Sequence, residues 1–131
     1  MQTFLPYPDF ARSARCLDTK RLGKQRVEAD QLVDTVLIGS GWSNHPAARM
    51  WSGYVAALVA YRNAVIDEWV RRGYRNSIIV LWRPELPELP PWFGREDFHS
   101  AHRAALLAKD YAHYSQFGWS ESPRISYIWP I

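Results

Sequence analysis

Residues 17–32 read LDTKRLGKQRVEADQL, and their spacing predicts an amphipathic helix that organises the fold. Asp18 and Thr19 are both good N-cap residues, and Gly39 suits the left-handed end of a helix. We therefore expect a helix from about residue 18 to residue 39. Its core-facing stripe would be Leu22, Ala29, Leu32, Val33 and Val36.

The charged side of this helix allows two interpretations. Arg21, Lys24 and Glu28 fall in one narrow sector beside the apolar stripe, and Arg26 projects from its opposite edge. Lys24 and Glu28 are spaced for a surface ion pair, which would stabilise the helix by only about 0.3 kcal/mol. In the functional interpretation Arg21 and Lys24 bind phosphates, and Glu28 acts as an acid or base or stabilises a developing cation.

Two further helices are predicted. One begins with Pro46 at its first position and runs unbroken to Arg72, before Gly73. The other covers about residues 97–116, with Asp97 as its cap. The sequence thus predicts an all-α protein, with residues 1–131 as a single domain of about three main helices.

Aromatic- and proline-rich segments connect these helices. Residues 1–16 are expected to form an extended arm, and GSGWSNHP (39–46) a linker. SIIVLW (77–82) has the composition of a strand but no evident partner, so we expect a buried connector. Four prolines then predict an irregular loop. In the irregular tail, Tyr127, Ile128 and Trp129 are expected to pack onto the core.

Composition indicates a soluble protein that could bind a polyanion. Aromatic residues make up 15% of the chain, and 13 arginines stand against 3 lysines, with a net charge of +3. Arginine suits phosphate recognition and aromatic rings stack on bases, although a genome rich in G and C would also favour arginine. The single cysteine and the lack of a long apolar run predict a cytoplasmic protein that does not contact membranes.

Histidines provide two further candidate sites. His45 precedes the helix that starts at Pro46, where it would bind an anion together with Arg49 or simply cap the helix. His99 and His102 have the spacing of a metal-binding pair, but no cysteine or carboxylate completes a recognisable set. We therefore expect no metal.

Four segments carry a resemblance to a known family. They are LDTKRLGKQRVEA, NHPAARMW, RRGY and FHSAHRAALLAKDYAHYSQFGW, and they occur in the family's order and spacing from about residue 2 to residue 119. The sequence resembles the pyrimidine-dimer DNA glycosylases of the phage endonuclease V type, and most closely their cellular branch. The resemblance implies an all-helical protein that cuts the glycosidic bond of a damaged pyrimidine in duplex DNA, without a cofactor or an obligate protein partner.

The resemblance also implies roles for residues. An N-terminal amine attacks the sugar C1′ and forms a Schiff base, and a glutamate corresponding to Glu28 then assists β-elimination. Arg21, Lys24 and Arg26, with His45 and Arg49, would hold the DNA backbone. The family has a small residue after the initiator methionine, whereas Gln2 stands here, which predicts that Met1 is retained.

Three activities therefore stay open. The Met1 amine is the nucleophile of a glycosylase with AP-lyase activity, or Glu28 activates water in a glycosylase without it. In the third, the chain is a non-catalytic nucleic-acid-binding module. In each case we expect the protein at the nucleoid, in the cytoplasm.

Overall fold

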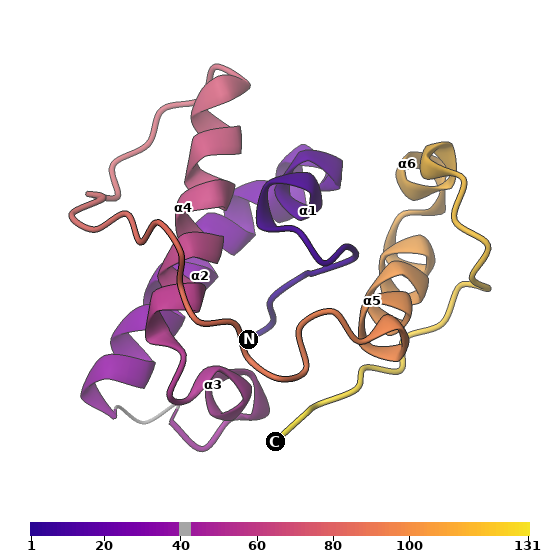
Figure 1. Ribbon diagram of the computed structural model, residues 1–131. Helices are drawn as coiled ribbons and strands as arrows, with labels where there is room; N and C mark the ends of the chain where they lie inside the picture. The colour runs from indigo at the N-terminus through magenta and orange to yellow at the C-terminus, as the bar shows by residue number, and fades with distance from the viewer. Residues whose placement is uncertain (40–42) are drawn as a thin grey trace.

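The computed structural model describes residues 1–39 and 43–131, and this part of the chain is helical, with no strand (Figure 1). The all-α prediction is confirmed. Residues 40–42 of the expected linker lie outside the described residues. The helices are α1 (Phe10–Cys16), α2 (Thr19–Ile38), α3 (Pro46–Trp51), α4 (Val55–Arg71), α5 (Glu96–Lys109) and α6 (Tyr111–Tyr114), followed by a 3₁₀ turn (Ser115–Phe117).

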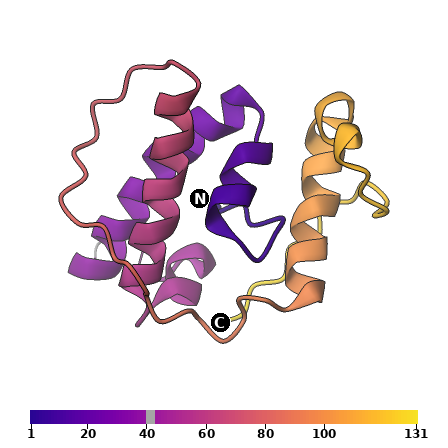
Figure 2. The same cartoon turned by 45° about the horizontal axis from the view of Figure 1, so that its top comes forward.

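The helix α2 has the predicted ends and the predicted buried stripe. The Asp18 carboxylate accepts a hydrogen bond from the Arg21 backbone N–H at 3.3 Å, and Gly39 ends the helix in the left-handed region, with φ 76°. Leu22, Ala29 and Leu32 are fully buried. They face the core, and α2 packs mainly against α4, beside which it runs in Figures 1 and 2.

The helix predicted over 46–72 is two helices. Pro46 does occupy the first turn of α3, but the chain turns at Gly53, with φ 82°, before α4 begins. The prediction of one unbroken helix was wrong because the apolar spacing continues through the break. Trp51 at the end of α3 and Tyr61 in α4 meet in the same core, with ring centroids 6.1 Å apart.

The helix predicted over 97–116 is also interrupted. The chain leaves helical geometry at Asp110, with φ −154° and ψ 77°, and the Asp110 side chain caps α6 by accepting the His113 N–H. Asp97 is not the cap of α5, because Arg95 occupies that position. Asp97 instead lies in the first turn, where a carboxylate stabilises the helix dipole.

The N-terminal arm, residues 1–9, is extended as expected, but α1 follows it where an extended chain was predicted through residue 16. Asp9 caps α1 by accepting the Arg12 N–H at 2.7 Å. In Figures 1 and 2 the arm lies between the α2–α4 pair and α5. The tail runs back along α5, and Tyr127, Ile128 and Trp129 pack against the core, as predicted.

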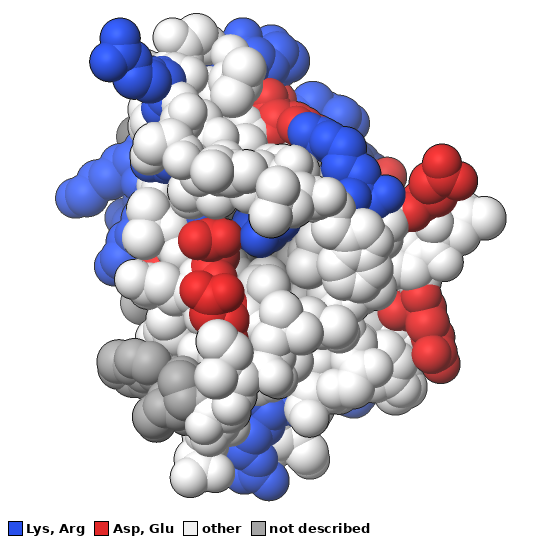
Figure 3. Space-filling model, turned by 90° about the vertical axis from the view of Figure 1, so that its left-hand side faces the viewer, with Lys and Arg blue, Asp and Glu red and all other residues white. Residues whose placement is uncertain are grey.

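The segment 77–82 is a connector without strand structure, as expected, but it is not buried. Ile79 is 74% exposed and Leu81 is 91% exposed. Figure 3 looks onto the side of the molecule where this segment lies, and most of that surface is uncharged, with basic residues gathered near its upper edge. The prediction of burial was wrong because apolar composition alone does not show which neighbours a segment has.

Candidate active site

A cavity of about 430 Å³ lies where the N-terminal arm meets α2, the end of α5 and the tail. It is lined by most of the site residues predicted from the sequence. We call it the Glu28 cleft. The predicted residues on its wall are Met1, Gln2, Arg21, Lys24, Glu28 and His45.

Glu28 reaches the cleft from the margin of the buried face of α2. Its side chain is 18% exposed, and one carboxylate oxygen lies 3.8 Å from the Lys24 ammonium nitrogen. The surface ion pair expected from the spacing is therefore present. Because Lys24 is 74% exposed, this pair contributes little to stability, and it leaves both groups accessible from the cleft.

Gln25 joins Glu28 to the N-terminal arm. Its side-chain nitrogen donates to the Gln2 carbonyl oxygen at 2.7 Å and to a Glu28 carboxylate oxygen at 3.1 Å. Its side-chain oxygen accepts the Tyr61 hydroxyl at 2.6 Å, and Tyr61 is fully buried. A single buried amide thus fixes the carboxylate relative to the start of the chain.

Side chains from other helices hold the rest of the arm. A buried extended segment without a sheet partner needs other partners for its N–H and C=O groups. The Phe4 N–H donates to the Tyr61 hydroxyl at 3.0 Å, and the Leu5 N–H donates to His102 Nδ1 at 2.9 Å. The Leu5 carbonyl accepts from His99 Nδ1 at 2.7 Å, so both ends of the Leu5 backbone are held by α5.

The histidine pair therefore binds backbone, and its protonation follows from those contacts. His99 Nε2 accepts the Gly94 N–H at 3.0 Å, which leaves the proton on Nδ1 for the Leu5 carbonyl. Burial lowers the pKa of His102 to about 3 and also lowers the pKa of His99. Within the described residues, no group of three or more side chains is arranged to hold a metal ion.

The cleft is strongly cationic. All three lysines of the chain line it, Lys20 and Lys24 from α2 and Lys109 from the end of α5, and Arg21 joins them. Among the described lining residues Glu28 is the one carboxylate. Such a concentration of positive charge favours a polyanionic ligand.

His45 has both of the roles considered from the sequence. Its Nδ1 accepts the Ala47 N–H at 3.1 Å and so caps α3, while the residue also lines the Glu28 cleft. Partial desolvation and, after it, the positive charge of the N-terminal amine lower the pKa of His45. This dependence places the imidazole within electrostatic reach of the Met1 amine.

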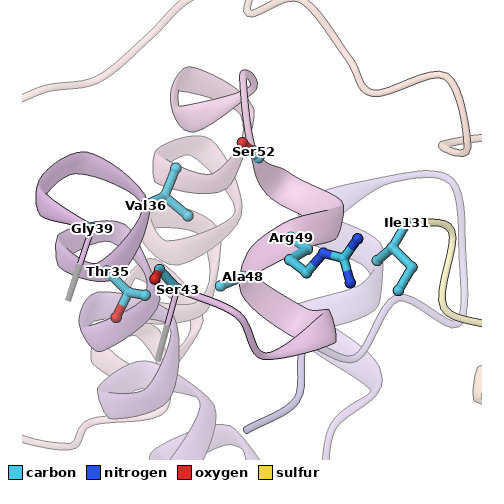
Figure 4. Close-up of a pocket in the computed structure, with 8 residues that line it drawn as sticks. All are labelled: Thr35, Val36, Gly39, Ser43, Ala48, Arg49, Ser52 and Ile131. Atoms are coloured by element: carbon cyan, nitrogen blue, oxygen red, sulfur yellow. The ribbon is translucent and has the colours of Figure 1, made fainter. Parts of the chain in front are cut away.

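Arg26 and Arg49 lie outside the Glu28 cleft. The Arg26 guanidinium is 5.3 Å from the centre of the Trp69 ring and donates to Asn76 Oδ1 at 2.8 Å. Arg49 lines a separate cavity of about 470 Å³, where its side chain extends toward Ile131 (Figure 4). Their contact with DNA phosphates stays a prediction.

Sequence reasoning missed several lining residues. Gln25 had a signal, because it is a polar residue on the buried stripe between Leu22 and Ala29. Lys20 had the same basic helix as its signal. No local pattern linked Lys109, Tyr127 or Trp129 to this site, because they come from the far end of the chain.

No helix among the described residues is both long enough and apolar enough to span a bilayer. Comparison with curated proteins and with solved structures finds no match for this chain. A comparison with protein families does find one. The model of the pyrimidine dimer DNA glycosylase family matches residues 1–80, which include the N-terminal arm, Glu28, His45 and all of α4. The chain therefore belongs to the pyrimidine dimer DNA glycosylase family.

Proposed function

We propose that this protein excises damaged pyrimidines from duplex DNA and then nicks the strand, with the α-amino group of Met1 as nucleophile and Glu28 as the assisting carboxylate. One observation carries the proposal. The first residue of the chain and Glu28 line the same cationic cleft, and Gln25 bridges the backbone of one to the carboxylate of the other.

The proposed reaction begins with the neutral amine, whose population is substantial near pH 8 for a free α-amino group. The amine nitrogen bonds to the sugar C1′, the bond from C1′ to the base breaks, and the base leaves with a proton. Opening of the sugar ring gives an imine between C1′ and the amine. Glu28 then assists removal of a C2′ proton, the 3′ phosphate leaves, and water releases the product from the amine.

The cations have a separate part in this proposal. Lys20, Lys24 and Lys109 neutralise phosphates on either side of the reacting sugar, while Arg21 is held by Asp18 at 3.2 Å. Phosphate contacts would fix the register of the duplex without reading its sequence.

The test is borohydride trapping on an oligonucleotide with one abasic site, together with base release from ultraviolet-irradiated duplex. Wild-type protein is expected to form a covalent adduct whose mass assigns the modified amine to Met1. The Glu28→Gln variant should still be trapped, because trapping needs only the amine, but it should nick at least about 100-fold more slowly. Glu88→Gln, which changes an exposed carboxylate of the connecting loop, serves as the control.

Two results would contradict parts of the proposal. Base release without any trapping would assign Glu28 to activation of water in a glycosylase without lyase activity. Salt-dependent binding with no base release, unchanged by Glu28→Gln, would favour the non-catalytic nucleic-acid-binding module, which the cationic cleft also supports.

A further inference from the structure

The wall of the Glu28 cleft opposite the cations is aromatic and comes from the tail. Tyr127 and Trp129 both line the cleft and are half-buried, with ring centroids 5.8 Å apart. The edge of the His45 ring lies 6.1 Å from Trp129. Both tail residues lie beyond residue 80, where the match to the family model ends.

This wall is fixed to the rest of the molecule before any ligand arrives. The Tyr127 ring meets the rings of Phe4 and His102, at 6.5 and 5.7 Å between centroids. Further up the tail, Glu121 accepts hydrogen bonds from Arg103 and Ser100, both at 2.8 Å. A wall held in this way keeps its position without a loss of conformational entropy on binding.

Trp129 differs from the tryptophans that serve the core. The indole N–H groups of Trp51, Trp69, Trp92 and Trp119 all donate to protein acceptors. The Trp129 indole N–H has no acceptor among the described residues, and it is not sealed from solvent. A large ring that borders a cavity, with its polar edge unpaired, is suited to contact a ligand.

We propose that Tyr127 and Trp129 form a stacking wall for a nucleobase that has been turned out of the duplex next to Glu28. This inference rests on the proposed function and adds to it the subsite for the base. The cations of the cleft contact phosphate and carry no information about the base, whereas an aromatic face binds the base itself. The alternative is that Trp129 only seals the tail against His45.

The test compares two substrates that differ only in the base. One duplex carries the damaged pyrimidine and the other carries a ready-made abasic site at the same position. Trp129→Ala is expected to lower kcat/KM for base excision roughly 10-fold or more, and to change the rate of nicking at the abasic site by less than about 2-fold. Trp129→Phe should recover much of the loss, and Trp82→Ala, which removes a 48% exposed ring outside the cleft, is the matched control.

Binding provides a second readout that does not require catalysis. A duplex with an unpaired 2-aminopurine should lose fluorescence on binding to wild-type protein, because the displaced base stacks on the wall, and should keep it with Trp129→Ala. Trp129→Leu repeats the measurement with the apolar volume retained, in case the alanine variant unfolds. If wild-type protein releases no base, the proposed function fails, and the fluorescence comparison still decides whether the wall binds a base.

Equal loss on both substrates, or no loss on either, would overturn the stacking wall. So would 2-aminopurine quenching that is the same in wild-type protein and in the Trp129 variants.

Discussion

Gln25 is the residue on which the geometry of the Glu28 cleft depends most directly. It is 1% exposed, and its amide makes hydrogen bonds to the Gln2 carbonyl, to Glu28 and to Tyr61. A hydrogen bond to a charged group contributes about 1.5–3 kcal/mol, and part of that contribution here goes into orienting Glu28.

We expect Gln25→Met, which is close in shape, to lower the single-turnover rate of nicking on an abasic duplex by about 10- to 100-fold. DNA affinity should change little, because no cation is removed. Gln31→Met, on the exposed side of the same helix, should leave the rate unchanged. A Gln25→Met variant that nicks at the wild-type rate would show that Glu28 needs no such support.

His102 makes stability depend on pH. Its pKa is about 3 in the folded protein, below its ordinary value of 6.5, so the unfolded chain binds more protons between these pH values. The free energy of unfolding should therefore fall as the pH is lowered from about 6.5 toward 3, by up to about 1.4 kcal/mol per pH unit for this group. His99, whose pKa is lowered as well, adds to the effect.

Urea unfolding at several pH values between 4 and 7 measures this slope. In His102→Asn, the side-chain oxygen can still accept the Leu5 N–H but does not titrate, so the slope should be smaller even where the variant is less stable overall. A slope equal to that of the wild type would mean that other groups control acid unfolding.

At the scale of elements, Gly23 sets the distance between α2 and α4. A Cβ atom at this position would lie 2.9 Å from two atoms of the Trp69 ring. That ring has little freedom to move, because its N–H donates to the Arg75 carbonyl at 2.8 Å and its face stacks on Tyr74 at 4.4 Å.

Gly23→Ala should therefore destabilise the protein by about 1–3 kcal/mol, although alanine favours a helix by about 1 kcal/mol over glycine. Denaturant unfolding gives the change. Combining Gly23→Ala with Trp69→Leu in a double-mutant cycle should remove most of the penalty, because the smaller side chain makes room for the methyl group. Additive effects would show that the loss arises elsewhere.

The same elements show what the sequence could predict. The ends of α2 were predictable because Asp18 and Gly39 act through local backbone geometry. The break at Gly53 was not, because the apolar residues on both sides face one core and their spacing hides the turn. Asp110 was missed for a similar reason, since α5 and α6 follow each other closely.

The candidate site divides along the same line. Glu28, Arg21 and Lys24 share one helix, so their proximity follows from helical spacing. Lys109, Tyr127 and Trp129 reach the cleft only through the packing of α5 and the tail against the N-terminal arm. No periodicity in one sequence encodes contacts of that range.

At the scale of the whole molecule, the lysines should control affinity for DNA. Each phosphate contact that is lost should lower the slope of log K against log salt by about 0.9 for duplex DNA. Replacing Lys20, Lys24 or Lys109 by alanine is therefore expected to weaken binding at low salt and to flatten this slope by about one unit each.

Fluorescence anisotropy across a range of salt concentrations measures the effect. Arg83→Ala removes a cation that is paired with Asp67 and does not line the cleft, so it should change neither quantity. A slope that is insensitive to all three lysines would place the DNA on another surface.

The grip on the N-terminal arm also has a consequence for biogenesis. Phe4 finds its partner 57 residues along the chain, and Leu5 finds one 97 residues along. Pairings so distant in sequence form late, after local helices are already present. During translation, α2 with Glu28 is complete long before α5 leaves the ribosome. A nascent or truncated chain would then have the carboxylate in place with no fixed amine beside it, so a DNA-cutting activity would arise only in the finished molecule.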